Sequence, residues 1–267
     1  METENKDYDA FKQLQKALKI LSERLIEQFK VFPDELKRLQ ETQKILNEQF
    51  EEIKKAIQLS ISPNLEKVLK ELPHKIKQVY LELAKRGWFL DLDVDPKETL
   101  QLNELLTNCS VEEVEEALIA RFNSRLSEIK QSIIEKYPRR KKIVEAAFNA
   151  HHREEYELSI PVLLAQADGI CKEEIKENIF KKEGKEKVGS YLNGIDSEDI
   201  IAAILSPLEE KSLPIWISEK KRLDDFNGLN RHMVLHGESS NYGTKTNSLK
   251  AISFINYVAE VFSGGMV

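Results

Sequence analysis

A chain of 267 residues, with 41% hydrophobic and 32% charged residues, has room for one large domain or two ordinary ones. It contains only 10 glycines and 8 prolines beside many leucines, isoleucines, lysines and glutamates, a composition typical of helical soluble proteins. The net charge of −6 argues against a general coating of phosphate-binding cations. Residues 211–250 have the opposite charge balance, with seven lysines and arginines and four acids. This segment is therefore compatible with a local basic cleft.

The cysteines and the N-terminus narrow the class of protein further. Cys109 and Cys171 are isolated and form no metal-binding pattern, so we expect two ordinary thiols, no metal and no cofactor. The first residues, METENKDYDAFKQ, lack the apolar segment of a signal peptide. No window approaches the ~18 apolar residues of a membrane-spanning helix. We therefore expect a cytoplasmic chain without a membrane partner.

The first 95 residues predict helices with coiled-coil spacing. Apolar residues recur in steps of three and four from Phe11 to Phe29, and a second stripe runs from Leu39 to Ile57. The sequence SISPN at 60–64 ends this stripe, and a third helix is expected from Leu65 to about Lys85. We predict a helical hairpin or coiled-coil-like region over residues 1–95, packed within the protomer or in a compact dimer.

The stretch KRGWFLDLDVDP, residues 85–96, is predicted to be the boundary between two regions. Gly87 can end the preceding helix, and Asp95-Pro96 is expected to stop regular structure. The apolar residues Trp88–Leu90 are expected to pin the two halves together. We therefore assign residues 96–267 to a second helical domain.

The pattern of this second region predicts helices and no convincing strand. Ser110 and Glu113 have the spacing of a capping box and open a helix expected to continue to Tyr137. The dense apolar run Ile160–Ala167 predicts a buried helix with Pro161 in its first turn. Further expectations are a helix over 139–151, a short helix ended by Pro207, a last helix from about Asn247, and one strand candidate at 213–218. The predicted fold class is all-α.

Residues 231–237, RHMVLHG, combine an arginine with two of the five histidines of the chain. His232 and His236 are four residues apart and share one face of a helix, whereas Arg231 and His236 lie about 140° apart on a straight helix. Gly237 suits the left-handed residue that ends a helix, and such an end lets the side chains converge where the helix dipole favours cations. We predict a helix C-terminus that presents two imidazoles and one guanidinium.

An arginine with one or two histidines is a minimal set of groups for cleaving RNA without a metal ion. The ribose 2′-hydroxyl attacks its own phosphate, a histidine takes or gives the proton, and the arginine stabilises the charge on the phosphate oxygens. No zinc-protease, serine-hydrolase, P-loop or dinucleotide-binding motif competes with this interpretation. The alternative is structural: His236 caps the helix, and Arg231 pairs with Asp168 or a nearby glutamate.

The segment Arg231-His232-x-x-x-His236 resembles the R-[N/H/D]-x(3–5)-H signature of the HEPN superfamily, and it lies late in a helical domain, as in that family. NRHMVLHG with the following YGT and NSLKAISFINY, and the upstream EYELSIPVLLAQADGIC, also resemble a group of uncharacterised bacterial and phage HEPN-like proteins. The resemblance covers about residues 140–262. It implies a helical bundle, commonly dimeric, in which two motifs meet in one composite site.

The resemblance further implies a metal-independent endoribonuclease of phage defence or of a toxin–antitoxin system, with RNA as its substrate. Arg231 and His236 would be the catalytic pair, and His232 the polar residue that orients or tunes them. The implied partners are a second copy of the chain and an antitoxin or a nucleotidyltransferase. The alternative is a noncatalytic helical interaction or oligomerisation protein whose Arg/His motif is structural.

Three residues are expected to support the motif, namely Asp168, Asn230 and Tyr242. Asp168 lies in a buried segment and needs a partner, which is either a side chain of the motif or an N–H at a helix terminus. Asn230 directly precedes the motif. Tyr242 lies in the run ESSNYGTKTN, which either offers hydrogen bonds and a stacking face to RNA or caps the last helix. The adjacent imidazoles of His151-His152-Arg153 point apart, so we expect a solvated face there.

Overall fold

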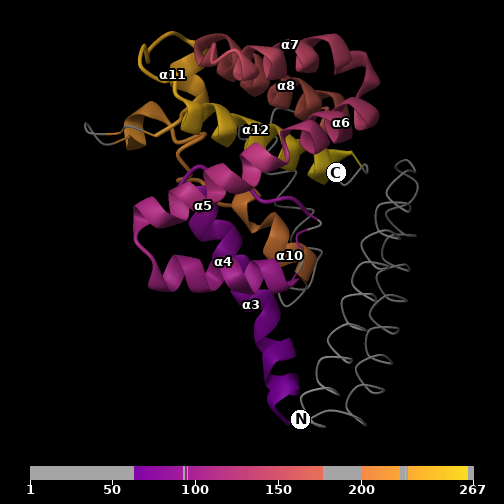
Figure 1. Ribbon diagram of the computed structural model, residues 1–267, viewed down its shortest axis with the longest axis vertical. Helices are drawn as coiled ribbons and strands as arrows, with labels where there is room; N and C mark the ends of the chain where they lie inside the picture. The colour runs from indigo at the N-terminus through magenta and orange to yellow at the C-terminus, as the bar shows by residue number, and fades with distance from the viewer. Residues whose placement is uncertain are drawn as a thin grey trace. The chain divides into compact units, whose positions relative to one another are not determined.

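The computed structural model describes residues 63–92, 94, 96–176, 200–222, 226 and 228–263 (Figure 1). The chain divides into two compact units, Met1–His74 and Lys75–Val267. The first two helices of the expected N-terminal hairpin lie outside the described residues. The domain boundary expected between residues 95 and 96 falls inside the second unit.

The described part of the chain is all-α, as predicted, and it contains no strand. Its α-helices are α3 (Pro63–Lys85), α4 (Pro96–Asn108), α5 (Val111–Ser124), α6 (Leu126–Lys136), α7 (Lys141–His152), α8 (Tyr156–Ile175), α10 (Ile200–Leu205), α11 (Arg231–Leu235) and α12 (Lys245–Phe262). Short 3-10 helices are η2 (Pro138–Arg140), η3 (Ser206–Leu208) and η4 (Glu219–Lys221). The strand candidate at 213–218 forms turns instead. In the ranges given above, no helix is both long and apolar enough to cross a bilayer.

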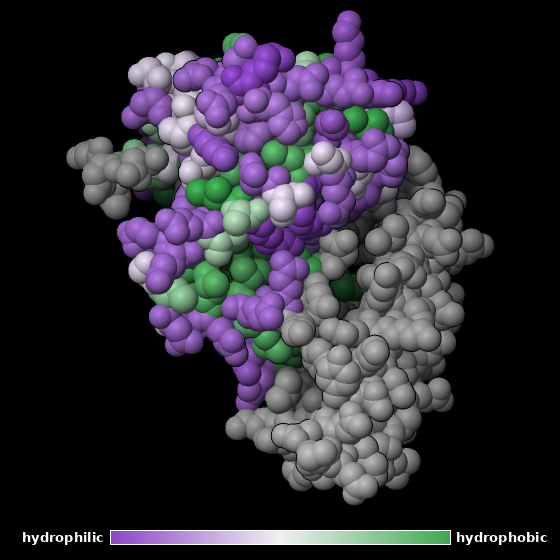
Figure 2. All heavy atoms as spheres, viewed as in Figure 1, coloured by the Kyte–Doolittle hydropathy of each residue, from purple (hydrophilic) through white to green (hydrophobic). Residues whose placement is uncertain are grey.

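Helix α12 is the centre of the second unit, because its side chains are buried on every face. Every residue from Ala251 to Ala259 is buried, including the polar Ser253 and Asn256. A helix buried all round has to be enclosed by other elements. Helix α8 packs along α12, and α5 and α6 cover it too (Figure 1). Among the coloured residues of Figure 2, hydrophilic ones cover most of the visible surface, with smaller groups of hydrophobic ones among them.

Several helix ends follow their local sequence signals. Ser110 caps α5 in the predicted capping box. Gly87 adopts φ +84° and ends α3, as predicted. Helix α12 begins at Lys245, slightly before the expected Asn247, because the side chain of Thr244 accepts a hydrogen bond from the Asn247 N–H. Local signals of this kind depend on few neighbours, which is why they could be read from the sequence.

Three expectations about helix ends are wrong. The single helix expected over Ser110–Tyr137 is interrupted at Arg125, where φ is −104° and ψ is 4°, so α5 and α6 are separate. Pro161 lies beyond the first turn of α8, because that helix already begins with the residues before the apolar run. Pro96 opens α4 instead of stopping regular structure, since proline is accommodated at the first position of a helix.

The apolar residues after α3 belong to the core of the second unit. Trp88 is fully buried and stacks on Phe122 of α5, with ring centroids 5.3 Å apart. Phe89 contacts Phe254 of α12 at a centroid distance of 4.9 Å. The expected role of Trp88–Leu90 was to pin two halves of the chain together. The contacts described here instead join this segment to α5 and α12 within one unit.

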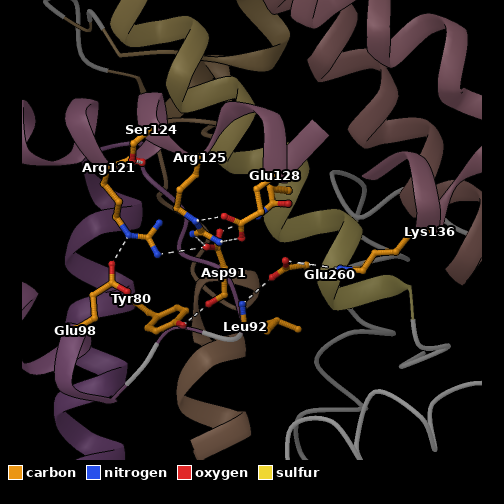
Figure 3. A network of polar contacts seen from close by, with 11 residues as sticks. Tyr80, Asp91, Leu92, Glu98, Arg121, Ser124, Arg125, Glu128, Lys136 and Glu260 are labelled. Carbon is orange, nitrogen blue, oxygen red and sulfur yellow. Dashed lines mark hydrogen bonds and ion pairs between the residues drawn. The ribbon is translucent and has the colours of Figure 1, made fainter. Parts of the chain in front are cut away.

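Asp91, whose carboxylate is buried, joins the same segment to three helices (Figure 3). The side chain of Asp91 is 0% exposed and accepts hydrogen bonds from Arg121, at 3.3 Å, and from Arg125. Its second oxygen accepts a hydrogen bond from Asn256 of α12 at 2.7 Å. The backbone carbonyl of Asp91 accepts a hydrogen bond from the Tyr80 hydroxyl at 2.5 Å. A buried carboxylate is tolerated only with such partners, and here they tie α3, α5 and α12 to one residue.

We predict that Asp91→Ala lowers the free energy of unfolding by about 3–5 kcal/mol, because the arginines and Asn256 lose a buried charged partner. Urea unfolding followed by circular dichroism measures the change. The control is Glu128→Ala, which removes a 62% exposed carboxylate that also pairs with Arg125 and should cost less than about 1 kcal/mol. An Asp91→Ala protein as stable as the wild type would contradict this role.

Candidate functional site

Helix α11 carries the Arg/His motif, and its first turn is fixed by Asn230. The Asn230 side chain accepts a hydrogen bond from the Met233 N–H at 3.1 Å and donates to the carbonyls of Pro214 and Ile217 at 2.8 and 3.0 Å. A helix of five residues is not stable alone, so these contacts hold it in place. Asn230 is 1% exposed, and its side-chain amide forms its hydrogen bonds inside the protein. It supports the motif by binding backbone groups of α11 and of the neighbouring segment.

The other end of α11 is closed by a left-handed glycine, as predicted. Gly237 has φ +73°, and the Glu238 N–H donates to the Met233 carbonyl at 2.8 Å. His236 is the C-cap residue, whose backbone N–H donates to the His232 carbonyl at 3.0 Å. The left-handed glycine reverses the chain at the end of α11, so Glu238 lies close to the motif.

The two motif histidines are exposed on one face of α11, as their spacing predicted. Their ring centroids are 4.3 Å apart with an interplanar angle of 48°. The Nε2 atom of His232 lies 3.0 Å from a carboxylate oxygen of Glu238. The other oxygen of Glu238 accepts a hydrogen bond from Arg222 at 3.0 Å. Sequence reasoning missed both Glu238 and Arg222, and the left-handed glycine is the one signal that could have revealed Glu238.

Arg231 is held by α8. Its Nε donates to Asp168 Oδ1 at 2.5 Å, and its second nitrogen pairs with Asp168 Oδ2. The two side chains are only 19% and 17% exposed. Burial lowers the pKa of Arg231 from its usual value, and a guanidinium paired with a carboxylate remains charged. The predicted partner of Asp168 is confirmed, and this pairing is compatible with both the catalytic and the structural interpretation.

A pocket of about 350 Å³ lies beside the motif. Arg231 and His232 line it, together with the segment from Ile215 to Lys220, whereas His236 is not among its lining residues. The Ile215 carbonyl accepts a hydrogen bond from the Arg231 N–H at 3.0 Å, which fixes this wall to α11. Its lining combines apolar and aromatic side chains with cations and with one carboxylate, that of Glu219.

Tyr242 anchors the loop between α11 and α12. Its hydroxyl donates to the Glu157 carbonyl at 3.1 Å, and its own carbonyl accepts a hydrogen bond from Asn247 at 3.0 Å. Gly243 follows, and a Cβ there would collide with the Glu157 carboxylate. Thr244 then caps α12. The loop therefore has the expected capping role, and contact of Tyr242 with RNA stays a prediction.

The solvated face expected for His151, His152 and Arg153 is only partly correct. His152 and Arg153 are exposed, but His151 is 4% exposed. Its Nδ1 lies 2.8 Å from the Ser248 hydroxyl, which in turn donates to Ser159 at 3.3 Å. Burial, assisted by nearby positive charge, lowers the pKa of His151 to about 4. His151 is a neutral core residue.

Within the described ranges, no cluster of three or more His, Cys, Asp or Glu residues could hold a metal ion. Cys109 is exposed, Cys171 is buried, and both are free thiols. No protein-family model, no curated protein and no solved structure matches the chain. The HEPN resemblance stays a prediction that rests on the motif and its flanking sequence.

The Arg231–Asp168 pair predicts a measurable coupling. We expect Arg231→Ala and Asp168→Ala each to lower the free energy of unfolding by about 1–3 kcal/mol, and the double variant to lose much less than the sum, because both remove one charged hydrogen-bonded pair. Urea unfolding of the four proteins gives the coupling energy. The exposed pair Arg153–Glu155 is the control and should show no measurable coupling. Additive losses at Arg231 and Asp168 would contradict the pairing.

His151 predicts a loss of stability in mild acid. The folded protein keeps this imidazole neutral down to about pH 4, whereas the unfolded chain binds the proton below its ordinary value near 6.5. The stability it contributes is therefore complete above about pH 6.5 and declines as the pH falls towards 4, by about 2 kcal/mol at pH 5. Urea unfolding at pH 7 and 5 should show a smaller decline in His151→Gln than in the wild type or in the exposed control His152→Gln. Equal declines in the free energy of unfolding of all three proteins would refute the role of His151.

Proposed function

We propose that this protein is a metal-independent endoribonuclease of HEPN type, acting through the motif on α11. The observation that carries the proposal is an exposed pair of imidazoles, with ring centroids 4.3 Å apart, on a short helix with both ends fixed. His232 and Arg231 line the same pocket. Proton-transfer groups beside a cation are what phosphodiester cleavage by a ribose hydroxyl needs.

The proposed reaction breaks one phosphodiester bond and forms another. The 2′-hydroxyl gives its proton to an imidazole while its oxygen bonds to the phosphorus atom. The bond from phosphorus to the 5′ oxygen breaks, and that oxygen takes a proton from the second imidazole or from water. The products are a 2′,3′-cyclic phosphate and a 5′-hydroxyl. Arg231, held by Asp168, stabilises the charge on the phosphate oxygens.

We further propose that two copies of the chain form the complete site. Within one chain, the described pocket is lined by Arg231 and His232 but not by His236. An exposed His236 at the end of α11 is available to a site on a second copy. A composite site of this kind fits the HEPN resemblance, as do a role in phage defence or in a toxin–antitoxin system and an antitoxin or nucleotidyltransferase partner.

The alternative is a noncatalytic helical interaction protein in which the motif is structural. It is favoured by the bidentate pair between Arg231 and Asp168 and by the buried Asn230, both of which fasten α11 to its surroundings. It does not account for the exposed imidazoles, because exposed rings add little to a fold. Replacing the imidazoles therefore separates the two functions better than replacing Arg231.

We predict that the purified full chain cleaves a structured RNA in excess EDTA. Replacing both His232 and His236 by alanine should lower the rate by at least about 100-fold without changing the thermal midpoint, since both rings are exposed. Cleavage is measured on labelled RNA at a temperature where circular dichroism shows every variant folded.

Two controls accompany this measurement. His152→Ala removes an exposed imidazole elsewhere and should leave the rate unchanged. DNA of the same sequence should stay intact, because it lacks the attacking hydroxyl. No cleavage of any RNA by the wild type, under conditions where a known ribonuclease works, would refute the proposed function and leave the interaction protein.

A further inference from the structure

We infer that His232, and not His236, is the imidazole that takes the proton of the substrate, and that Glu238 is its positioning residue. This inference rests on the proposed ribonuclease function and assigns the roles within its site. The HEPN resemblance implied the opposite assignment, with His236 catalytic and His232 tuning. The contacts around the two rings differ, and this difference carries the inference.

Among the described residues, a charged side chain is aligned on His232, and none is seen on the ring of His236. Arg222, Glu238 and His232 form a chain of two contacts, each 3.0 Å long. The side chains become more exposed along it, from 9% for Arg222 through 36% for Glu238 to 48% for His232. Arg222 is thus held inside the protein, whereas His232 reaches solvent. A carboxylate that orients an imidazole in this way is the usual support of a histidine base.

The backbone holds Glu238 in this place independently of its side chain. Gly237 takes the left-handed conformation, and the N–H groups of Glu238 and Ser239 both donate to the Met233 carbonyl, at 2.8 and 3.1 Å. These bonds return the chain over the helix end. The approach of Glu238 to His232 therefore follows from the helix cap and does not depend on a flexible loop.

The contact decides which nitrogen of His232 can act as a base. A carboxylate only accepts hydrogen bonds, so the Nε2 atom facing Glu238 carries the hydrogen. In the neutral ring the other nitrogen, Nδ1, then has the lone pair that accepts a proton. In the proposed reaction the proton of the 2′-hydroxyl passes to Nδ1. The positive charge that develops on the ring is stabilised by Glu238.

The pocket supports the same assignment. His232 and Arg231 line it, whereas His236 packs against the His232 ring at a tilt and is not among the lining residues. A nucleotide held there can contact His232 and Arg231 of one chain. His236 then packs on the ring that reacts and, in a dimer, faces the second copy.

The hydrogen position can be measured without any RNA. Long-range proton–nitrogen NMR spectra of the full chain at neutral pH report which ring nitrogen of each histidine carries the hydrogen, and His232→Gln identifies the signal by its loss. We expect His232 with hydrogen on Nε2 in the wild type and in Glu238→Gln, whose amide oxygen can still accept. Glu238→Ala should convert it to a mixture. Glu155, whose side chain is 40% exposed, supplies the matched control Glu155→Ala, which should change nothing.

The roles are measured by cleavage of RNA in EDTA. His232→Gln should reduce the rate at least about 100-fold, and His236→Gln less than about 10-fold. Glu238→Ala should reduce the maximal rate about 10-fold or more with little change in KM, and Glu238→Gln should restore part of it. A greater loss in His236→Gln than in His232→Gln would overturn the assignment.

The two sets of data separate failure of this inference from failure of the proposed function. If the wild type cleaves RNA but His232 carries its hydrogen on Nδ1, or Glu238→Ala has full activity, the assignment is wrong and the ribonuclease stands. If the NMR result is as expected but no RNA is cleaved, the dyad of Glu238 and His232 exists and the ribonuclease proposal falls, together with the catalytic role inferred for His232.

Discussion

The enclosure of α12 is the constraint on which the rest of the described fold depends. A helix buried on all sides has no face left for water, so α5, α6, α8 and the segment after α3 must surround it. Its polar side chains then need partners inside the protein. Asn256 bonds to Asp91, Ser253 accepts a hydrogen bond from the Phe89 N–H at 3.2 Å, and Ser248 meets His151. Each of these bonds also positions a surrounding element.

The candidate site lies where the chain approaches this central helix. Helix α11 and the loop after it lead directly into α12, and Asn230, Arg231 and Tyr242 fasten them to the surrounding residues and to α8. The imidazoles, in contrast, are exposed. Side chains that face solvent on a rigidly held segment add little to stability, whereas a catalytic group needs this combination of access and fixed position. This contrast favours chemistry over structure as the role of the histidines.

The sequence predicted what depends on near neighbours and missed what depends on distant ones. Capping at Ser110 and the left-handed glycines at 87 and 237 are local, and they are where expected. Arg125, where the expected helix is interrupted, bonds to a carboxylate 34 residues away, a contact that no helical pattern reveals. His151 is an intermediate case: it continues the buried stripe of Val144, Ala147 and Phe148, a spacing that could have indicated its burial. Of the site, the pair of Arg231 with Asp168 was foreseen as one alternative, whereas Glu238 was missed because its position depends on the turn at Gly237.

The terminal groups of the RNA fragments test most directly whether the imidazoles of α11 act on RNA. The full chain is incubated with a defined, structured RNA in EDTA, and the fragments are analysed by mass spectrometry. Attack by the ribose hydroxyl predicts a 2′,3′-cyclic phosphate on one fragment and a 5′-hydroxyl on the other. Fragments with a 3′-hydroxyl and a 5′-phosphate, or an RNA that stays intact, would contradict the account.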